Sequence, residues 1–426
     1  MRMTTVAIMT RTATGSCHVS AASATVECTN IDITTPIAAT TTTTTAPAAP
    51  ATGKTMENDN VKKEEETETR LTYTTKDFFL STTSMHGEDL TSQLDILLPR
   101  KWMAAKVAGA FIYSVDNVET KILPGKYGIV SQINVNRKLM RRKPENVVDI
   151  QQPFNPDKFN FTKIQNKEIL MNLQFLSEEP KEDSVLKRNV KEASVTLEAT
   201  LIINNAPICH THSLLVPFLE KCQPQVLNHE GLTTAIHTVL LSKSTDLRIA
   251  FNSLGGFASV NHLHFHLYYF PYTLYTETAE CERLAGPCYI FKDHFAPGFV
   301  FQLENGDVDQ LASSVMAVVN VFLKEKVAHN LFITRGTPLE TIHTKGGMHS
   351  TVRVVLWARD FAYGAKDVSL FATAVCELAG HVPIYSLDQW DTLSENDLLP
   401  LITSVCRDDY EAILPKVTDV FQPNGI

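Results

Sequence analysis

The sequence predicts an α+β fold built around a mainly antiparallel sheet that is flanked by helices. Strand-like and helix-like patterns alternate only loosely after Leu90, and hairpin-like pairs of strands occur among them, as is typical of antiparallel sheets. Apolar residues occupy 44% of the 426 positions and charged residues 20%, as in ordinary globular proteins. This length allows about two to three domains with a hydrophobic core.

The first part of the chain, 1–70, differs from the rest. It is rich in Thr, Ala, Ser and Pro, contains six consecutive threonines from Thr40, and ends near an acidic patch at 64–66. Such a tract cannot bury enough apolar area to offset its ordering entropy, so we expect a disordered tail. The sequence does not decide whether Met56 is an alternative start. Because the opening lacks the apolar face of a transit peptide, we expect a cytoplasmic protein.

The elements after the tail are predicted from apolar residues at helical or strand spacing. A turn at Leu123 opens the first strand, apolar residues alternate over 195–203, and Asp307 provides a helix cap. We expect helices over 91–110 (interrupted by Pro99), 226–240, 308–322 and up to Gly380, and strands over 121–135, 195–203, 212–218, 248–251, 262–267, 330–334 and 352–357.

Charge and composition exclude several classes of protein. The net charge of −9 argues against a general nucleic-acid or anionic-membrane binder, and no stretch has the roughly 18 consecutive apolar residues of a membrane span. Eight cysteines without a C-x-x-C pair are too sparse for a disulfide scaffold, so we interpret them as reduced thiols. Gly53-Lys54-Thr55 resembles the end of a phosphate-binding loop, but Ala48 replaces its first glycine and no strand precedes it.

Three histidines alternate with apolar residues in His262-Leu263-His264-Phe265-His266-Leu267. Because residues two apart share a face of a strand, the three imidazoles are predicted to line one side and the apolar residues the other. One interpretation is a chance pattern on an exposed strand. A metal site is another, but His262 and His266 would lie about 13 Å apart along the strand, so a metal would have to recruit Cys209, His210 or His212.

The third interpretation is covalent catalysis at phosphorus, with the central imidazole as nucleophile. Neutral histidine is available near pH 7 because its ordinary pKa is about 6.5. The Gly255-Gly256 turn would let backbone N–H groups approach a phosphate. Neutral hydrogen bonds to its oxygens are expected from four neighbouring side chains, Asn252, Ser253, Ser259 and Asn261.

These residues resemble the histidine-triad signature, His-x-His-x-His with apolar spacers. The longer string from Phe251 through His264 is similar to the GDP-D-glucose phosphorylase family, which is related to plant GDP-L-galactose phosphorylases and to galactose-1-phosphate uridylyltransferase. Other blocks fit the same family in the expected order; they are 123–125, 141–144, 152–154, 159–163, 212–217, 329–336, 356–359 and 376–381. The resemblance covers roughly 111–383, about two-thirds of the chain.

The resemblance implies a HIT-like catalytic region over 90–300 with a C-terminal α+β region over 301–426 packed on it. It implies that His264 becomes guanylylated by GDP-glucose, that inorganic phosphate then releases GDP, and that His262 and His266 contact the phosphate or tune His264. No cofactor or metal is required. One departure matters: the uridylyltransferases and plant phosphorylases have Gln where this chain has His266, and hydrolases of the superfamily have His. Transfer to water, or nucleotide binding without turnover, therefore stays open.

A basic segment supplies candidate phosphate contacts. Between Arg137 and Lys163 the chain holds seven basic and three acidic side chains. Lys163 is the best candidate for a substrate contact and Arg248 the next. Because the segment lacks an interleaved aromatic platform, it does not indicate an RNA site. We expect His329 and His381 to be buried core histidines.

Overall fold

The computed structural model describes residues 69–80, 92–140, 146–177, 194–340, 350–362, 371–388 and 390–422. Residues 1–68 of the predicted tail and the family block at 141–144 lie outside these described residues, whereas residues 69 and 70 lie within them. All described residues belong to one unit of the chain, Glu65–Ile426.

The strands of the described residues form a sheet of 11 strands and a second sheet of three. In spatial order, the large sheet consists of β1 (Arg70–Tyr73), β4 (Ile169–Ser177), β5 (Ser194–Ile203), β6 (Ser213–Pro217), β8 (Phe265–Tyr269), β7 (Leu247–Asn252), β12 (Ala328–Gly336), β13 (Thr351–Arg359), β11 (Phe299–Gln302), β10 (Cys288–Phe291) and β9 (Cys281–Ala285). Its neighbouring strands are antiparallel apart from the β1–β4 pair. The small sheet consists of β14 (His381–Ile384), β3 (Val130–Ile133) and β2 (Thr120–Ile122).

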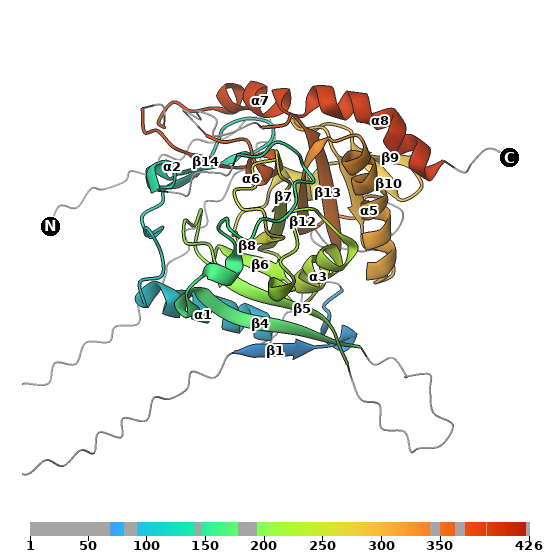
Figure 1. Cartoon of the computed structure of the whole chain (residues 1–426). Helices are drawn as coiled ribbons and strands as arrows, with labels where there is room; N and C mark the ends of the chain where they lie inside the picture. The colour runs from blue at the N-terminus through green and yellow to red at the C-terminus, as the bar shows by residue number, and fades with distance from the viewer. Residues whose placement is uncertain are drawn as a thin grey trace, which may run out of the picture. The chain divides into compact units, whose positions relative to one another are not determined.

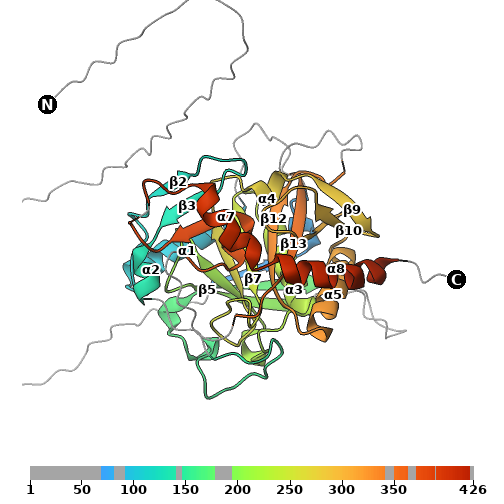
Figure 2. The ribbon, with the colours of Figure 1, turned by 90° about the horizontal axis from the view of Figure 1, so that it is seen from above.

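The helices of the described residues lie around these sheets (Figures 1 and 2). They are α1 (Gln93–Val107), α2 (Val135–Met140), α3 (His229–Leu240), α4 (Tyr275–Thr278), α5 (Val308–Lys324), α6 (Val375–Ala379), α7 (Glu395–Ser404) and α8 (Arg407–Phe421). Short 3-10 helices are η1 (Thr75–Asp77), η2 (Phe161–Lys163), η3 (Asn166–Glu168) and η4 (Leu219–Lys221).

The central strands are buried on both faces because each face is covered. Ile249 and Phe251 of β7 pack in the same apolar cluster as residues of α1, α3, α5 and α8. Ala250, between them, belongs to a second cluster that contains residues of β3, β14, α6 and α7. The small sheet therefore lies on the face of the large sheet opposite to α3 and α5, and it carries α2 directly after β3.

The α+β class with a mainly antiparallel sheet is confirmed. The helix predicted over 91–110 is α1, which contains Pro99, and α6 ends at Gly380, whose φ of 98° provides the left-handed cap. His329 and His381 are 1% and 0% exposed, which confirms that they are core residues. None of the helices in the described ranges combines the length and apolar character that a membrane crossing needs.

Candidate active site

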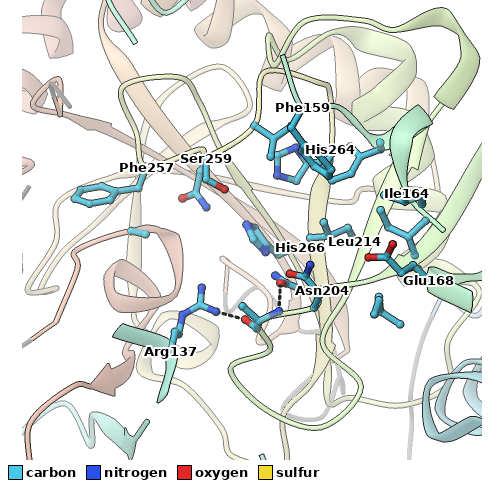
Figure 3. A pocket seen from close by; sticks show the side chains of 18 residues that line it. Arg137, Phe159, Ile164, Glu168, Asn204, Leu214, Phe257, Ser259, His264 and His266 are labelled. Carbon is cyan, nitrogen blue, oxygen red and sulfur yellow. Dashed lines mark hydrogen bonds between the residues drawn. The ribbon is translucent and has the colours of Figure 1, made fainter. Parts of the chain in front are cut away.

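A pocket opens at the place where β7 ends and β8 begins (Figure 3). Its cavity volume is about 120 Å³, within about 940 Å³ of empty space that includes open solvent. Its polar lining includes Arg137, Asn204, Asn252, Ser259, His264 and His266. Four residues of the predicted site are thus brought together, namely Asn252, Ser259, His264 and His266.

The predicted strand is shorter at its start than the histidine pattern suggested. β8 begins at Phe265, so His266 is the one triad histidine inside the strand, and the idea that one strand face carries all three is wrong. The alternation itself is confirmed on the other face, because Leu263, Phe265 and Leu267 are 0% exposed in the core.

The early end of the β7–β8 pairing has a physical cause in a buried amide. The two strands pair from Leu247 with Tyr269 as far as Ala250 with His266 and then separate. The side chain of Gln225 fills the gap: its Nε2 donates to the carbonyls of Asn252 (2.9 Å) and His264 (3.1 Å), and its Oε1 accepts from the His264 N–H (2.9 Å). This amide satisfies backbone groups that the sheet no longer pairs, and it fixes the backbone on both sides of the pocket.

His264 presents an unprotonated ring nitrogen. Its Nδ1 lies 2.7 Å from the carbonyl oxygen of His262, and because a carbonyl only accepts, Nδ1 carries the proton. Nε2 of the neutral ring then holds the free lone pair. Burial lowers the pKa of His264 from 6.5 to about 4, although the hydrogen bond to His262 opposes this shift. The ring is therefore neutral at pH 7.

His266 has the opposite tautomer, set by a chain of hydrogen bonds. The backbone N–H of Ile208 donates to Nδ1 of His212 (2.9 Å), so the proton of His212 is on Nε2. That nitrogen lies 3.0 Å from Nδ1 of His266 and donates to it, which leaves the His266 proton on Nε2. Burial lowers the pKa values of both rings well below 6.5, so both are neutral. Oδ1 of Asn204 accepts from the Ala206 N–H (3.1 Å), which leaves Nδ2 of Asn204 3.3 Å from Nε2 of His212; both of these nitrogens are donors in this tautomer, so they do not form a hydrogen bond.

His262 lies behind the pocket and supports its wall. The ring is 0% exposed, and its Nδ1 accepts a hydrogen bond from the N–H of Phe161 (3.2 Å). Its centroid is 5.4 Å from that of Phe161 and 5.5 Å from that of Phe154. His262 therefore positions two parts of the site: its ring holds the η2 segment, and its carbonyl holds the ring of His264.

Asn252 is oriented by the neighbouring strand and by α6. Its Oδ1 accepts from Nδ2 of Asn330 in β12 (2.6 Å) and from the backbone N–H of Val375 (3.1 Å). With the oxygen occupied in this way, the amide nitrogen is the group that Asn252 offers to the pocket. Ser259 contributes a hydroxyl to the lining.

Four predicted residues lie outside the pocket lining and hold the turn that precedes β8. The Ser253 hydroxyl accepts from the His329 N–H (2.9 Å), and the Gly256 N–H donates to the Ser253 carbonyl (2.9 Å). Gly255 has φ of +76°, and a Cβ there would lie 2.5 Å from the ring of Phe361. The Asn261 side chain donates to the carbonyls of 152 and 153 and accepts from the Gln225 N–H. These residues shape the turn, and the Gly256 N–H is used within it.

The two predicted cationic contacts also lie outside the lining. Lys163 Nζ donates to the carbonyls of Pro156 (2.5 Å) and Lys158 (2.7 Å) on the outside of the η2 segment. Arg248 forms an ion pair with Glu277 at 2.5 Å, and the two side chains are 1% and 0% exposed. The cation that reaches the pocket is Arg137 of α2, whose guanidinium donates to the carbonyl of Ala206.

A metal site is not assembled in the described part of the chain, where no three His, Cys, Asp or Glu side chains are arranged to hold an ion. Cys209 is buried, whereas His210 is exposed and lies 3.5 Å from Asp116. His212 instead contacts His266, so the two histidines of this segment do not form a pair.

The site therefore has the features of the histidine-triad class: a neutral imidazole with a free Nε2, at the start of a strand and in an open pocket. The chain belongs to the GDPGP1-like family, whose N-terminal domain matches residues 93–268 and whose C-terminal domain matches residues 292–415.

Several known proteins are similar to this chain. GDP-D-glucose phosphorylase 1 of Danio rerio is 36% identical over 335 residues, which cover 78% of this chain and 92% of that protein. The Homo sapiens protein of the same name is 37% identical over 320 residues, covering 74% and 80%. Among solved structures, yeast Ap4A phosphorylase Apa2 matches with a TM-score of 0.47 and 16% identity, covering 76% of this chain and 95% of that one.

Proposed function

We propose that this chain phosphorolyses GDP-D-glucose to GDP and glucose 1-phosphate through a guanylylated His264. The proposal is supported by the activity for which the relatives are named and by the chemistry of the pocket. The observation that carries it is the hydrogen bond from His264 Nδ1 to the His262 carbonyl at 2.7 Å, because it leaves Nε2 unprotonated as a nucleophile.

In the first step, Nε2 of His264 attacks the α-phosphorus of GDP-glucose. The bond from that phosphorus to the bridging oxygen breaks, and glucose 1-phosphate leaves with the electron pair. A phosphate leaving group has a second pKa of about 6, so it departs at neutral pH without a strong general acid. In the second step, an oxygen of inorganic phosphate attacks the same phosphorus, the nitrogen–phosphorus bond breaks, and GDP forms.

The remaining groups stabilise negative charge on the transferred phosphoryl group. His266 offers an Nε2–H, Asn252 an amide N–H and Ser259 a hydroxyl, all neutral donors that do not repel an incoming phosphate. Arg137 provides the positive charge that the pyrophosphate needs. Because their tautomers differ, His264 acts as the nucleophile and His266 as a hydrogen-bond donor.

The proposed ligands are a GDP-hexose and inorganic phosphate, and the proposed location is the cytoplasm. The division into regions over 90–300 and 301–426 stays a prediction, as does the absence of a nucleic-acid partner.

The central test is incubation with GDP-glucose in the presence and absence of phosphate. The proposal expects GDP only with phosphate and little GMP without it. Equal rates of GMP formation in both reactions would instead identify a hydrolase, the rival that the third histidine of the triad suggested.

The intermediate can be trapped by quenching a reaction without phosphate and analysing peptides by mass spectrometry. We expect one GMP on the peptide that contains His264 and none in the His264→Ala variant. His229→Asn is a matched control, because His229 is a half-exposed histidine on α3 outside the pocket lining. Undiminished turnover in His264→Ala would overturn the mechanism.

A further inference from the structure

Glu168 is the one acidic side chain that lines the pocket in the described part of the chain. A carboxylate repels a pyrophosphate, so it must face an uncharged part of the substrate. The candidates are the guanine base, the ribose and the hexose.

The position of Glu168 favours the base. Figure 3 shows Glu168 beside Ile164 and Leu214 at one end of the pocket, with Phe257 at the opposite end and His266 between them. The Glu168 end thus has apolar side chains that suit the faces of a planar purine. Arg137 lies away from this end, on the far side of His266.

The carboxylate is held in place yet keeps free acceptor capacity. Glu168 is the last residue of η3 and forms a capping box, in which Oε2 accepts the backbone N–H of Gln165 at 2.8 Å. That bond uses one acceptor site of a group that has about four. Its partner is a backbone donor rather than a cation, so the negative charge is not neutralised within this bond.

We propose that Glu168 is the guanine-selecting residue of this pocket, its carboxylate accepting the N1–H and the 2-amino group of the base. This inference rests on the proposed function, because it assumes that a guanine nucleotide binds with its phosphates at His264. Guanine presents two adjacent donors on that edge, which a carboxylate can accept side by side. Adenine presents an unprotonated N1 and no 2-amino group, so it would leave the carboxylate opposed by a lone pair.

Binding of free nucleoside diphosphates, measured by calorimetry without phosphate or hexose, tests the inference separately from turnover. The probes are GDP, IDP, which keeps N1–H but lacks the 2-amino group, and ADP, which lacks both donors. We expect affinity to fall in that order, with GDP at least about 30-fold tighter than ADP, since one hydrogen bond to a charged group contributes about 1.5–3 kcal/mol.

The Glu168→Gln variant should weaken GDP by about 30-fold, bringing GDP and IDP to within about threefold of each other. It should not weaken ADP, because the new amide no longer opposes the lone pair of adenine N1 and can donate to it. Glu198→Gln is the matched control, because Glu198 is exposed on β5 and outside the pocket lining. Equal weakening of GDP and ADP in Glu168→Gln would assign the carboxylate to the ribose and overturn the inference, as would unchanged GDP affinity. A protein that hydrolyses GDP-glucose but keeps this order of binding would refute phosphorolysis and still support the role of Glu168.

Discussion

Replacing Gln225 by Glu tests whether one buried amide holds the nucleophile in place. Gln225 is 0% exposed, and its Nε2 donates to the carbonyls of Asn252 at 2.9 Å and His264 at 3.1 Å. In Gln225→Glu an oxygen takes the place of this nitrogen at almost the same size. The acceptor for the His264 N–H is retained, whereas both donors are lost.

The cost follows from the two carbonyls that lose their partner. A buried polar group without a hydrogen bond costs about 1–3 kcal/mol, so two such groups predict a loss of about 2–6 kcal/mol in the free energy of unfolding. Protonation of the new carboxyl would restore one donor, which places the expected loss at the lower end of this range. The rate of His264 guanylylation should fall at least about tenfold, because the nucleophile is positioned through its own backbone.

Urea unfolding followed by circular dichroism measures the stability, and a single-turnover reaction without phosphate measures the guanylylation rate. Gln310→Glu serves as the control, because Gln310 is exposed on α5 and its change should stay within about 0.5 kcal/mol. A loss below about 1 kcal/mol together with an unchanged guanylylation rate would refute the role assigned to Gln225.

Three further predictions concern protons on the histidines. The single-turnover rate of guanylylation should stay constant from about pH 8 to about pH 5 and then fall with an apparent pKa of about 4. The reason is that burial lowers the pKa of His264 to that value. A fall in rate with an apparent pKa near 6.5 would contradict this. The free energy of unfolding should also decline as the pH drops from 6.5 to about 4. In this range His262 and His264 bind protons in the unfolded chain but stay neutral in the folded chain, so protonation favours the unfolded state. His212→Leu should lower kcat about tenfold or more, because His266 would lose the hydrogen bond that fixes its tautomer. His212→Gln retains a donor and should keep more activity. Equal kcat values in the two variants would show that His212 acts through packing and not through its hydrogen bond.

The part of the site that local pattern determines was predictable. Alternation of apolar residues located β5 and the core face of β8, and the histidine motif contained two residues that line the pocket, His264 and His266. The start of β8 was not predictable in this way, because it depends on Gln225. This residue fills the gap between the two strands but precedes His264 by 39 residues in the sequence. A single glutamine in a loop carries no pattern that indicates such a role.

Charge alone did not show which cationic side chain lines the pocket. Lys163 and Arg137 both belong to one basic segment, and the direction of each side chain depends on where η2 and α2 are placed by distant strands. Arg248 shares its strand face with Asn252, but Glu277, which binds it, arrives from α4. His212 was noticeable as one of two histidines close together in the sequence, yet its hydrogen-bond partner, His266, is 54 residues away.

The continuous sheet ties the two family domains into a single folding unit. β7 of the first domain and β12 of the second pair side by side from Ile249 with Ile333 to Asn252 with Asn330, so the domain junction runs through the middle of the sheet. Either half alone would present an apolar strand with a row of unpaired N–H and C=O groups, the form most prone to associate with other chains. During synthesis β7 therefore lacks this neighbour until residues 330–333 of β12 have left the ribosome.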